Sequence, residues 1–489
     1  MGILPTGQGC LRRNHGLAKG SVLKNARSWS ATSSSPEGEV WVPSAAKSDE
    51  VWFVFPPELR EDPGMKHERT VKLGIVGLGA RTEVLLVSLF ALEGVEIRAV
   101  CDVSETAIER ILAIFDRNGK GRPAVFRSHR ELLARDDVEA VLAPTSWNSH
   151  LPIAADAMEA GKYAAFEVGG ASSTDELWRL VHAYEKTGTP CMMLENCCYG
   201  RNELMVLNMV RQGLFGELVH CEGGYEHDLR DGDCLRVEKG QERALHNRYR
   251  NADLYPTHQL GPVAKILGIN RGNRFMSLTS TASKARGQAL QARHLHGAGT
   301  ALGDMVFAKG DVVTTVIKCA GGETITLTHS VSLPRPYSRN ARVQGTKGIW
   351  LEDAKGIHLE GISPTEELID PAGNPYTMHR WDAVESFYGK YDHPLWREYK
   401  DRTVGGHGGM DCLALMAFFD AVRNRTNTPI DVYDCAAWMS VTCLSEQSIS
   451  LGSMPVAFPD FTNGKWIRRE PAPVNRWSLH EVHESCFGR

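Results

Sequence analysis

The chain has 489 residues, 42% of them hydrophobic, and carries a formal net charge of −4 at pH 7. This length and hydrophobic content allow two or three domains with buried cores. The small negative charge gives no indication of nucleic-acid binding, and no apolar run approaches the roughly 18 residues that a membrane-spanning helix needs. The 12 cysteines form no zinc-type pair of CxxC motifs. We therefore expect no metal site, and free thiols in a reducing compartment.

The first fifty residues are rich in Ser, Gly, Lys and Arg, and no acidic residue precedes Glu37. Such a composition predicts disorder, because it cannot bury a core. Arg12-Arg13 resembles a twin-arginine signal, but the apolar stretch that export needs does not follow it. Met65 lies just before the first expected strand. We expect residues 1–64 to be disordered or a dispensable extension, and the protein to be cytoplasmic.

From Val71 onward, apolar strands alternate with amphipathic helices. The strands are expected at 72–77, 95–101, 124–126, 138–143, 163–166 and 191–194, and the helices at 81–92, 104–117, 128–135, 150–160, 176–186 and 203–212. This alternation predicts a doubly wound parallel sheet of the Rossmann type. We assign residues 65–195 to this α/β domain.

The pattern changes after Val219. The β-branched runs 312–318, 323–331 and 341–351 are separated by Gly-Gly or Thr-Lys-Gly turns, which indicates a largely antiparallel open sheet. Helices are expected again at 411–423 and 431–450, packed against the first domain or behind the second sheet. The chain is therefore expected to combine an α/β with an α+β domain, the latter a substrate-binding domain at 196–465, followed by a C-terminal tail at 466–489.

A glycine turn follows the first strand of the α/β domain. Gly77 permits a tight turn, Gly79 lets the backbone approach a pyrophosphate, and the next helix offers free N–H groups to the phosphates. Asp102 ends the second strand, where an acid holds a ribose hydroxyl. The motif favours NAD binding but is incomplete, since Thr82 replaces its third glycine. An ordinary glycine turn in an α/β core is the alternative.

Polar and aromatic clusters lie at the ends of the expected elements, where open α/β sheets place their ligands. They are residues 144–150, 167–168, 195–199, 225–228, 255–258, 334–339 and 405–411. Each cluster alone is typical of structural residues, whereas several together after a nucleotide-binding unit indicate one site. Glu226 and Asp228 are candidates for a carboxylate pair, although a solvated strand edge explains them equally well.

The order of these motifs resembles the Gfo/Idh/MocA oxidoreductase superfamily. The strings at 193–199, 254–258, 334–339 and 406–411 resemble glycoside hydrolase family 109, and the similarity runs from about Val71 to about Phe461. The resemblance implies a hydrolase that releases N-acetylgalactosamine from glycans with a tightly held NAD that is recycled. A homo-oligomer is possible, whereas neither a nucleic-acid nor a membrane partner is expected.

Two departures from the dehydrogenases of that superfamily support the hydrolase interpretation. Dehydrogenases carry Glu-Lys-Pro where this chain has Glu167-Val168-Gly169, so the lysine that takes part in proton transfer is absent. They also carry an aspartate four residues before the catalytic histidine, a position held here by Leu254, with Asp253 one residue away. A sugar or inositol dehydrogenase with net redox turnover and a catalytically silent NAD-binding regulator stay open as alternatives.

The resemblance assigns two sets of binding residues. The glycine turn and the matching motifs give the NAD contacts Gly77, Gly79, Ala80, Arg81, Asp102, Trp147, Asn148, Ser149, His150, Glu167, Val168 and Asn196. The sugar site is given by Tyr225, Arg243, Tyr255, Pro256, Thr257, His258 and Tyr337, with His407 added from its glycine-rich turn. For His407, a structural capping role is the alternative.

The mechanism implied by the resemblance needs no pair of carboxylates. A hydride leaves C3 of the sugar for NAD, the C3 ketone acidifies C2, elimination across C1–C2 expels the aglycone, water adds, and the hydride returns. An imidazole suits the C3 hydroxyl, and we choose His258, which follows the expected helix start at Pro256-Thr257. Tyr255 or Tyr337 would be the C2 base or an orienting donor.

Overall fold

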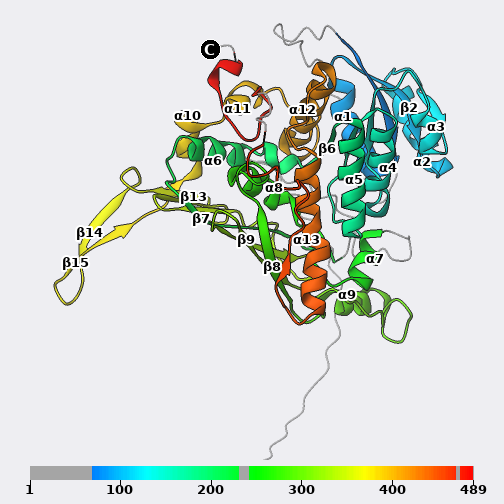
Figure 1. Ribbon diagram of the computed structural model, residues 1–489. Coiled ribbons are helices and arrows are strands. Elements are labelled where there is room, and N and C mark those ends of the chain that lie inside the picture. The colour runs from blue at the N-terminus through cyan, green and yellow to red at the C-terminus, as the bar shows by residue number, and fades with distance from the viewer. Residues whose placement is uncertain (1–68, 231–241, 470–473, 488–489) are drawn as a thin grey trace, which may run out of the picture. The chain divides into compact units, whose positions relative to one another are not determined.

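The computed structural model describes residues 69–230, 242–469 and 474–487, so the expectation for residues 1–64 lies outside the described residues. The first sheet has six parallel strands in the order β3-β2-β1-β4-β5-β6. Its strands are β1 (Val71–Val76), β2 (Val95–Cys101), β3 (Ala124–Phe126), β4 (Ala140–Ala143), β5 (Tyr163–Phe166) and β6 (Cys191–Met193). The expected Rossmann architecture is confirmed (Figure 1).

Five helices connect these strands. They are α1 (Ala80–Ala91), α2 (Glu105–Arg117), α3 (His129–Leu133), α4 (Trp147–Glu159) and α5 (Thr174–Thr187). Ser104 and Ser173 cap α2 and α5, since each hydroxyl accepts a hydrogen bond from an N–H of the first turn. The prediction that the fourth helix begins at residue 150 is wrong by one turn. The N–H groups of Ser149 and His150 already bond to the carbonyl of Ser146, so Trp147 starts the helix.

The second sheet has nine strands in the order β16-β13-β12-β11-β7-β10-β9-β8-β17. They are β7 (Leu218–Glu226), β8 (Phe275–Ala282), β9 (Val313–Cys319), β10 (Thr324–Ser330), β11 (Arg342–Gly345), β12 (Gly348–Leu351), β13 (Gly356–Leu359), β16 (Asp382–Ala383) and β17 (Val456–Ala457). Every pair is antiparallel except β7 with β10. The expected strand 341–351 is two strands, β11 and β12, joined by a turn at Thr346-Lys347.

Helices cover the sheets and join them. They are α6 (Arg201–Arg211), α7 (Glu242–Tyr249), α8 (Thr257–Ile266), α9 (Gly287–His296), α10 (Tyr388–Tyr391), α11 (Pro394–Tyr399), α12 (Met410–Asn424) and α13 (Val432–Ser450), with short 3-10 helices that include η1 (Asn196–Tyr199). The α8 helix packs on β7 and η1, and α13 contacts both α5 and β8, so these helices tie the two sheets together (Figure 1). One hydrophobic core consequently runs through both.

A separate hairpin, β14 (Thr365–Ile369) with β15 (Pro375–His379), extends from the second sheet (Figure 1). All of its residues are exposed except the half-buried Leu368. By contrast, Trp477 and Leu479 near the C-terminus are buried, and the Tyr199 hydroxyl donates to the Trp477 carbonyl. Among the described residues, we find no helix long and apolar enough to cross a membrane.

A buried ionic cluster fixes α8 against the start of α13. The ammonium of Lys265, on α8, lies 2.5 Å from a carboxylate oxygen of Asp434, on α13, and donates to the Pro429 carbonyl at 2.6 Å. Arg271 donates to both oxygens of the same carboxylate, at 2.8 and 2.9 Å. The side chain of Asp434 is 1% exposed. Buried charges of this kind are tolerated because each one has a partner.

We expect Asp434→Ala to lower the free energy of unfolding by about 3–5 kcal/mol, because Lys265 then stays buried without its ionic partner and the half-buried Arg271 keeps only Asp431. Burial alone would raise the pKa of Asp434, but Arg271 and Lys265 outweigh it and lower the pKa. A lowered folded-state pKa means that this stabilisation is present above the unfolded pKa of about 3.9 and is lost as the pH falls. The difference between wild type and variant should therefore shrink in acid.

Urea unfolding of both proteins at pH 7 and in acid measures this difference. The control is Asp116→Ala, which removes an exposed ion pair with Arg122, whose Nε donates to Asp116 at 2.8 Å, and should change stability only slightly. A loss no larger than that of the control at pH 7 would contradict the assignment.

Candidate active site

The candidate site lies where the carboxyl ends of β4, β5 and β6 meet the N-terminus of α8 and the end of β7. Each strand contributes the residues that follow it: Trp147 after β4, Glu167 after β5 and Glu195 after β6. Parallel strands bring such residues to one edge of the sheet. The α8 helix approaches this edge closely, because Gly261 has no side chain: a Cβ there would lie 2.9 Å from the Glu195 side chain.

A buried carboxylate holds the histidine. Nδ1 of His258 lies 2.8 Å from Oε1 of Glu195, whose side chain is fully buried. Burial would raise the pKa of Glu195, but His258 and further hydrogen bonds outweigh it and keep the pKa below its ordinary value. Within the described residues, Nε2 of His258 makes no hydrogen bond. An ionised Glu195 thus fixes the imidazole and leaves Nε2 for another partner.

Aromatic rings surround His258. Its ring lies 4.9 Å from that of Tyr255 and 5.5 Å from that of Tyr225, and the two tyrosine rings are 4.6 Å apart. Tyr337 lies 6.1 Å from Tyr225 and is 40% exposed, so it borders the opening. The guanidinium of Arg243 lies 4.7 Å from the centre of the Tyr255 ring. The structure therefore groups five of the residues that the sequence assigned to the sugar site.

Aromatic contacts also link this group to the Rossmann side. Trp147, at the start of α4, stacks on Tyr255 with ring centres 5.6 Å apart and lies 5.1 Å from the Arg243 guanidinium. Pro256 and Thr257 are buried at the start of α8. Trp147, which was predicted to contact NAD, therefore lies against Tyr255 and Arg243, which were predicted to bind the sugar.

At the glycine turn, the backbone at the start of α1 is not covered by side chains of the described residues. Gly77 has a φ of +96°, and a Cβ there would lie 2.5 Å from the side chain of Thr145. A Cβ at Gly79 would meet nothing within 4 Å, and no side chain caps α1. Asp102 accepts hydrogen bonds from the N–H groups of Leu78 and Ser104, at 2.7 and 2.8 Å.

These features fit a dinucleotide. The uncapped helix end suits a pyrophosphate, and the half-buried Asp102 retains lone pairs for ribose hydroxyls. The hydroxyl of Thr145, at the end of β4, is a buried polar atom without a hydrogen-bond partner in the described chain. The residues present therefore agree with an NAD site.

Three other residues assigned to NAD are tied together. Arg81 donates through Nε to Glu167 at 2.8 Å and through both terminal nitrogens to Asp411, and Asn196 donates to Asp411 at 2.7 Å. His407 also bonds to Asp411, at 3.0 Å. These contacts place His407 on the cofactor side, and no contact joins it to the tyrosines within the described residues.

The remaining assigned residues differ in accessibility. Asn148 is exposed and Ser149 half-buried, and the Asn148 side-chain oxygen accepts from the Ser172 hydroxyl at 2.8 Å. Val168 is buried. His150 is fully buried against Phe166, with ring centres 5.6 Å apart, and desolvation lowers its pKa to about 3. Its role as an NAD contact stays a prediction, since its ring does not reach the surface.

Glu226 and Asp228 do not form a carboxylate pair poised for displacement. Glu226 ends β7 and forms an ion pair with Arg335. Asp228 lies beyond the strand and binds the guanidinium of Arg230 at 2.7 and 2.8 Å. Each carboxylate is therefore neutralised by an arginine of its own.

Sequence reasoning gave no role to Asp253 and Glu195. Asp253 is 1% exposed and accepts the N–H of Tyr255 at 3.2 Å, so it fixes the turn that presents Tyr255. Desolvation raises its pKa to about 7. The available signals were a carboxylate two residues before Tyr255 and an acid two residues after the end of β6.

Glu195, Cys197 and His258 are the one group in the described chain whose donor atoms are close enough for a metal ion, within 4.8 Å of one another. Burial raises the pKa of the Cys197 thiol well above its ordinary value, which disfavours the thiolate that binds metals. Glu195 and His258 already bond to each other. The group is therefore best described as a hydrogen-bonded pair beside a thiol.

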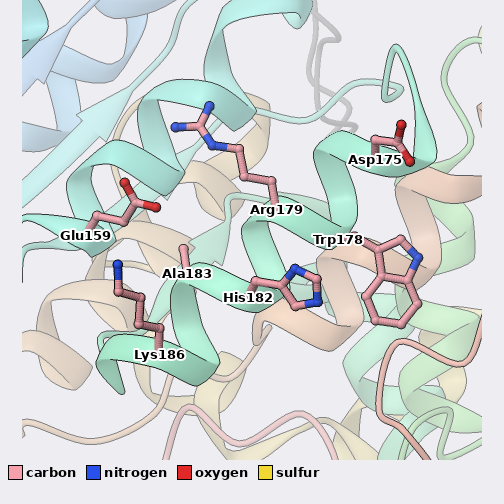
Figure 2. A pocket seen from close by; sticks show the side chains of 7 residues that line it. All are labelled: Glu159, Asp175, Trp178, Arg179, His182, Ala183 and Lys186. Atoms are coloured by element: carbon pink, nitrogen blue, oxygen red, sulfur yellow. The ribbon is translucent and has the colours of Figure 1, made fainter.

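A second hollow lies apart from this site, on the outer surface of α5 and the end of α4. Figure 2 shows its lining, which includes Trp178, Arg179, His182 and Lys186, and its volume is about 360 Å³. Its residues belong to one face of α5 and to Glu159 of α4, away from the strand ends. None of them belongs to the group around His258.

The chain is similar to known proteins over most of its length. Residues 71–195 match an oxidoreductase family with an NAD-binding Rossmann fold, and residues 199–468 match the C-terminal domain of glycosyl hydrolase 109. An alpha-N-acetylgalactosaminidase of Tannerella forsythia is 40% identical over 438 residues, covering 84% of this chain and 91% of the relative. One of Shewanella oneidensis is 42% identical over 412 residues, covering 83% and 88%.

Solved structures share the fold. The scyllo-inositol dehydrogenase of Lactobacillus casei, solved with NAD(H) and scyllo-inositol, matches with a TM-score of 0.55 at 11% identity, over 80% of this chain and 99% of that chain. Myo-inositol 2-dehydrogenase of Lactobacillus plantarum gives a TM-score of 0.56 at 14% identity, over 80% and 100%. The two family matches and the relatives at about 40% identity show that the chain belongs to glycoside hydrolase family 109, in the NAD-binding Gfo/Idh/MocA group, and is a glycosidase.

Proposed function

We propose that this glycosidase releases N-acetylgalactosamine from glycoconjugates, with NAD held at the Rossmann domain and recycled in every turnover. The observation that carries the proposal is the buried Glu195–His258 pair, which opens onto the tyrosines next to the glycine turn. The names of the relatives from Tannerella forsythia and Shewanella oneidensis support the sugar.

The cofactor would be held by the glycine turn, Asp102 and the residues that follow β4 and β5. When bound, NAD⁺ supplies a hydride acceptor for C3 of the sugar and later returns the hydride. A ketone at C3 makes the C2 proton acidic, which permits elimination of the aglycone across C1–C2 and addition of water. No pair of free carboxylates is required, in agreement with the arginine partners of Glu226 and Asp228.

His258 would accept the proton of the C3 hydroxyl at Nε2. Glu195 holds Nδ1, which fixes the tautomer and stabilises the imidazolium that forms. The buried setting strengthens this electrostatic contribution, because solvent screening is weak there.

The tyrosines would orient the sugar. Burial raises the pKa of Tyr255 and of Tyr337 above the ordinary value, while Arg243 and Arg339 oppose the effect. A raised pKa favours hydroxyl groups that donate hydrogen bonds over phenolates that act as bases. Arg339 also anchors the segment that carries Tyr337, through Glu203 at 2.6 Å and Glu352 at 3.2 Å.

We expect the purified protein to carry NAD and to release p-nitrophenol from an aryl N-acetylgalactosaminide without added cofactor. A cofactor regenerated in place has no reason to leave between turnovers. Denaturation followed by mass spectrometry of the supernatant measures the NAD per polypeptide. Activity with no nicotinamide in the protein would exclude the proposal, and release only with stoichiometric NAD reduction would favour a dehydrogenase.

We expect His258→Ala and Glu195→Gln each to lower kcat by about 10²-fold or more, the usual contribution of a general acid or base. NAD content should stay that of the wild type. The control is Glu398→Gln, which affects a half-buried ion pair with Arg476 at 3.0 Å. A folded His258→Ala protein with near wild-type turnover would move the role to another group.

The hydrogen on C2 distinguishes elimination from displacement. Hydrolysis in D₂O should give N-acetylgalactosamine deuterated at C2, since the C2 proton leaves and is replaced. A displacement glycosidase never breaks that bond. Full retention of protium at C2, measured by NMR together with a C2 isotope effect of unity, would reject the elimination route.

A further inference from the structure

The carboxylate of Asp411 accepts four hydrogen bonds from residues in three different parts of the chain. Its Oδ1 accepts from Arg81 at 2.9 Å and from Asn196 at 2.7 Å, and its Oδ2 accepts from Arg81 at 2.7 Å and from His407 at 3.0 Å. Asp411 lies in the first turn of α12, and its side chain is 1% exposed. A carboxylate offers about four lone-pair sites, so this one is saturated by protein donors.

The carboxylate of Asp411 is held in its charged form. Burial would raise the pKa of Asp411, but Arg81 and His407 outweigh it and lower the pKa far below its ordinary value. Arg81 lies between two carboxylates, Asp411 and Glu167, which raise its pKa against the effect of burial. Arg81 therefore links two acids, because its guanidinium donates to both Asp411 and Glu167.

The backbone beside Asp411 is shaped to admit its carboxylate. A Cβ at Gly406 would lie 2.6 Å from Oδ2 of Asp411, so a side chain at 406 would displace it. His407 adopts a φ of +54°, in the left-handed region that non-glycine residues rarely use. The same loop is held to α1, since the Ser88 hydroxyl donates to the Val404 carbonyl at 3.0 Å.

Asp411 thereby holds Arg81 at the start of α1 and Asn196 at the start of η1. Through Arg81 it is also linked to Glu167, which follows β5. These are the places where the cofactor residues Arg81, Glu167 and Asn196 lie. Asp411 itself is enclosed by them and has no free lone pair for a ligand. Its position is that of a support behind the residues expected to contact NAD.

We infer that Asp411 is a positioning residue that sets the affinity of the protein for NAD. The inference rests on the proposed function in one respect, the binding of NAD at the Rossmann domain. Without the carboxylate, Arg81 keeps Glu167 as its single ionic partner and Asn196 loses its acceptor, so the wall of the cofactor site is no longer held in one arrangement. Hydrogen-bond partners of metal ligands change metal affinity by about 10- to 100-fold, and we expect an effect of similar size for a partner that holds residues of the NAD site.

The test compares Asp411→Asn with Asp420→Asn. The first substitution keeps the size of the side chain but turns an NH₂ group toward the donors of Arg81, Asn196 or His407. The second makes the same change on the same helix, at a half-buried aspartate that makes no side-chain hydrogen bond within the described residues. Five quantities are measured: NAD per polypeptide after gel filtration, the Kd of the stripped protein for NAD, the melting temperature with and without NAD, and kcat and the KM for the sugar at saturating NAD.

Asp411→Asn should weaken the Kd for NAD by roughly 10-fold or more and lose NAD on the column. Saturating NAD should restore most of kcat, with the KM for the sugar unchanged, and Asp420→Asn should match the wild type. Some loss of melting temperature is expected in the stripped protein as well, because Arg81 loses a buried ionic partner, so the deciding quantity is the Kd for NAD of the folded variant. A wild-type Kd, or a drop in melting temperature of the stripped protein with unchanged NAD affinity, would overturn the inference and assign Asp411 to folding alone.

A second variant covers the case in which Asp411→Asn does not fold. His407→Ala removes one of the four hydrogen bonds at a side chain that is 52% exposed, so folding is not at risk. It should speed the dissociation of NAD measurably, and an unchanged rate would count against the inference. If wild type itself binds no NAD, the proposed function fails, whereas a wild type that binds NAD with all variants equal to it defeats this inference only.

Discussion

The site depends on the hydrogen bond between Glu195 and His258, because this bond connects the last strand of the parallel sheet to a helix that packs on the second sheet. Glu195 follows the last strand of the parallel sheet, and His258 lies in the first turn of a helix that packs on the second sheet. A buried carboxylate is stable only with a partner, so the pair constrains how α8 lies against β6. Gly261 makes the approach possible by leaving room for the Glu195 side chain.

The proposed mechanism places hydrolysis on a redox fold. Val168 is buried at the position where the resemblance gives the superfamily's dehydrogenases a lysine for proton transfer, so no ammonium lies there. The titratable group that faces the tyrosine rings is instead an imidazole hydrogen-bonded to a buried carboxylate. In the proposed cycle, such a pair would take a proton from the substrate and return it to the same substrate, with no net oxidation.

The regular part of the fold could be predicted from the sequence, because apolar strands and amphipathic helices alternate with clear periodicity before residue 195. The central strand of the second sheet, β7, was not predicted beyond a change of pattern, since its two glycines and its charged residues conceal the strand. The start of α4 was placed one turn late, because Trp147-Asn148-Ser149 carries no helical periodicity and Ser146 accepts the first hydrogen bonds through its carbonyl.

The parts of the site that short sequence motifs encode could be predicted. The contacts between residues far apart in the chain could not. The group of Tyr225, Tyr255, His258 and Tyr337 was recognised from local motifs, and the structure brings these rings within reach of one another. The partner of His258 lies 63 residues before it, so no local spacing reveals that contact. Such pairings depend on how the sheets pack.

The exposure of the β14–β15 hairpin has a consequence for its local stability. An isolated two-stranded ribbon is marginally stable in water, and here hardly any of its side chains is shielded by the rest of the chain. Segments with few buried contacts open locally at little cost, while the core opens only with the whole molecule. The tight turn at residues 370–374, held by the Asp370 carboxylate, is therefore a position suited to a peptide tag or a fluorophore, because the strands that flank it are almost entirely exposed.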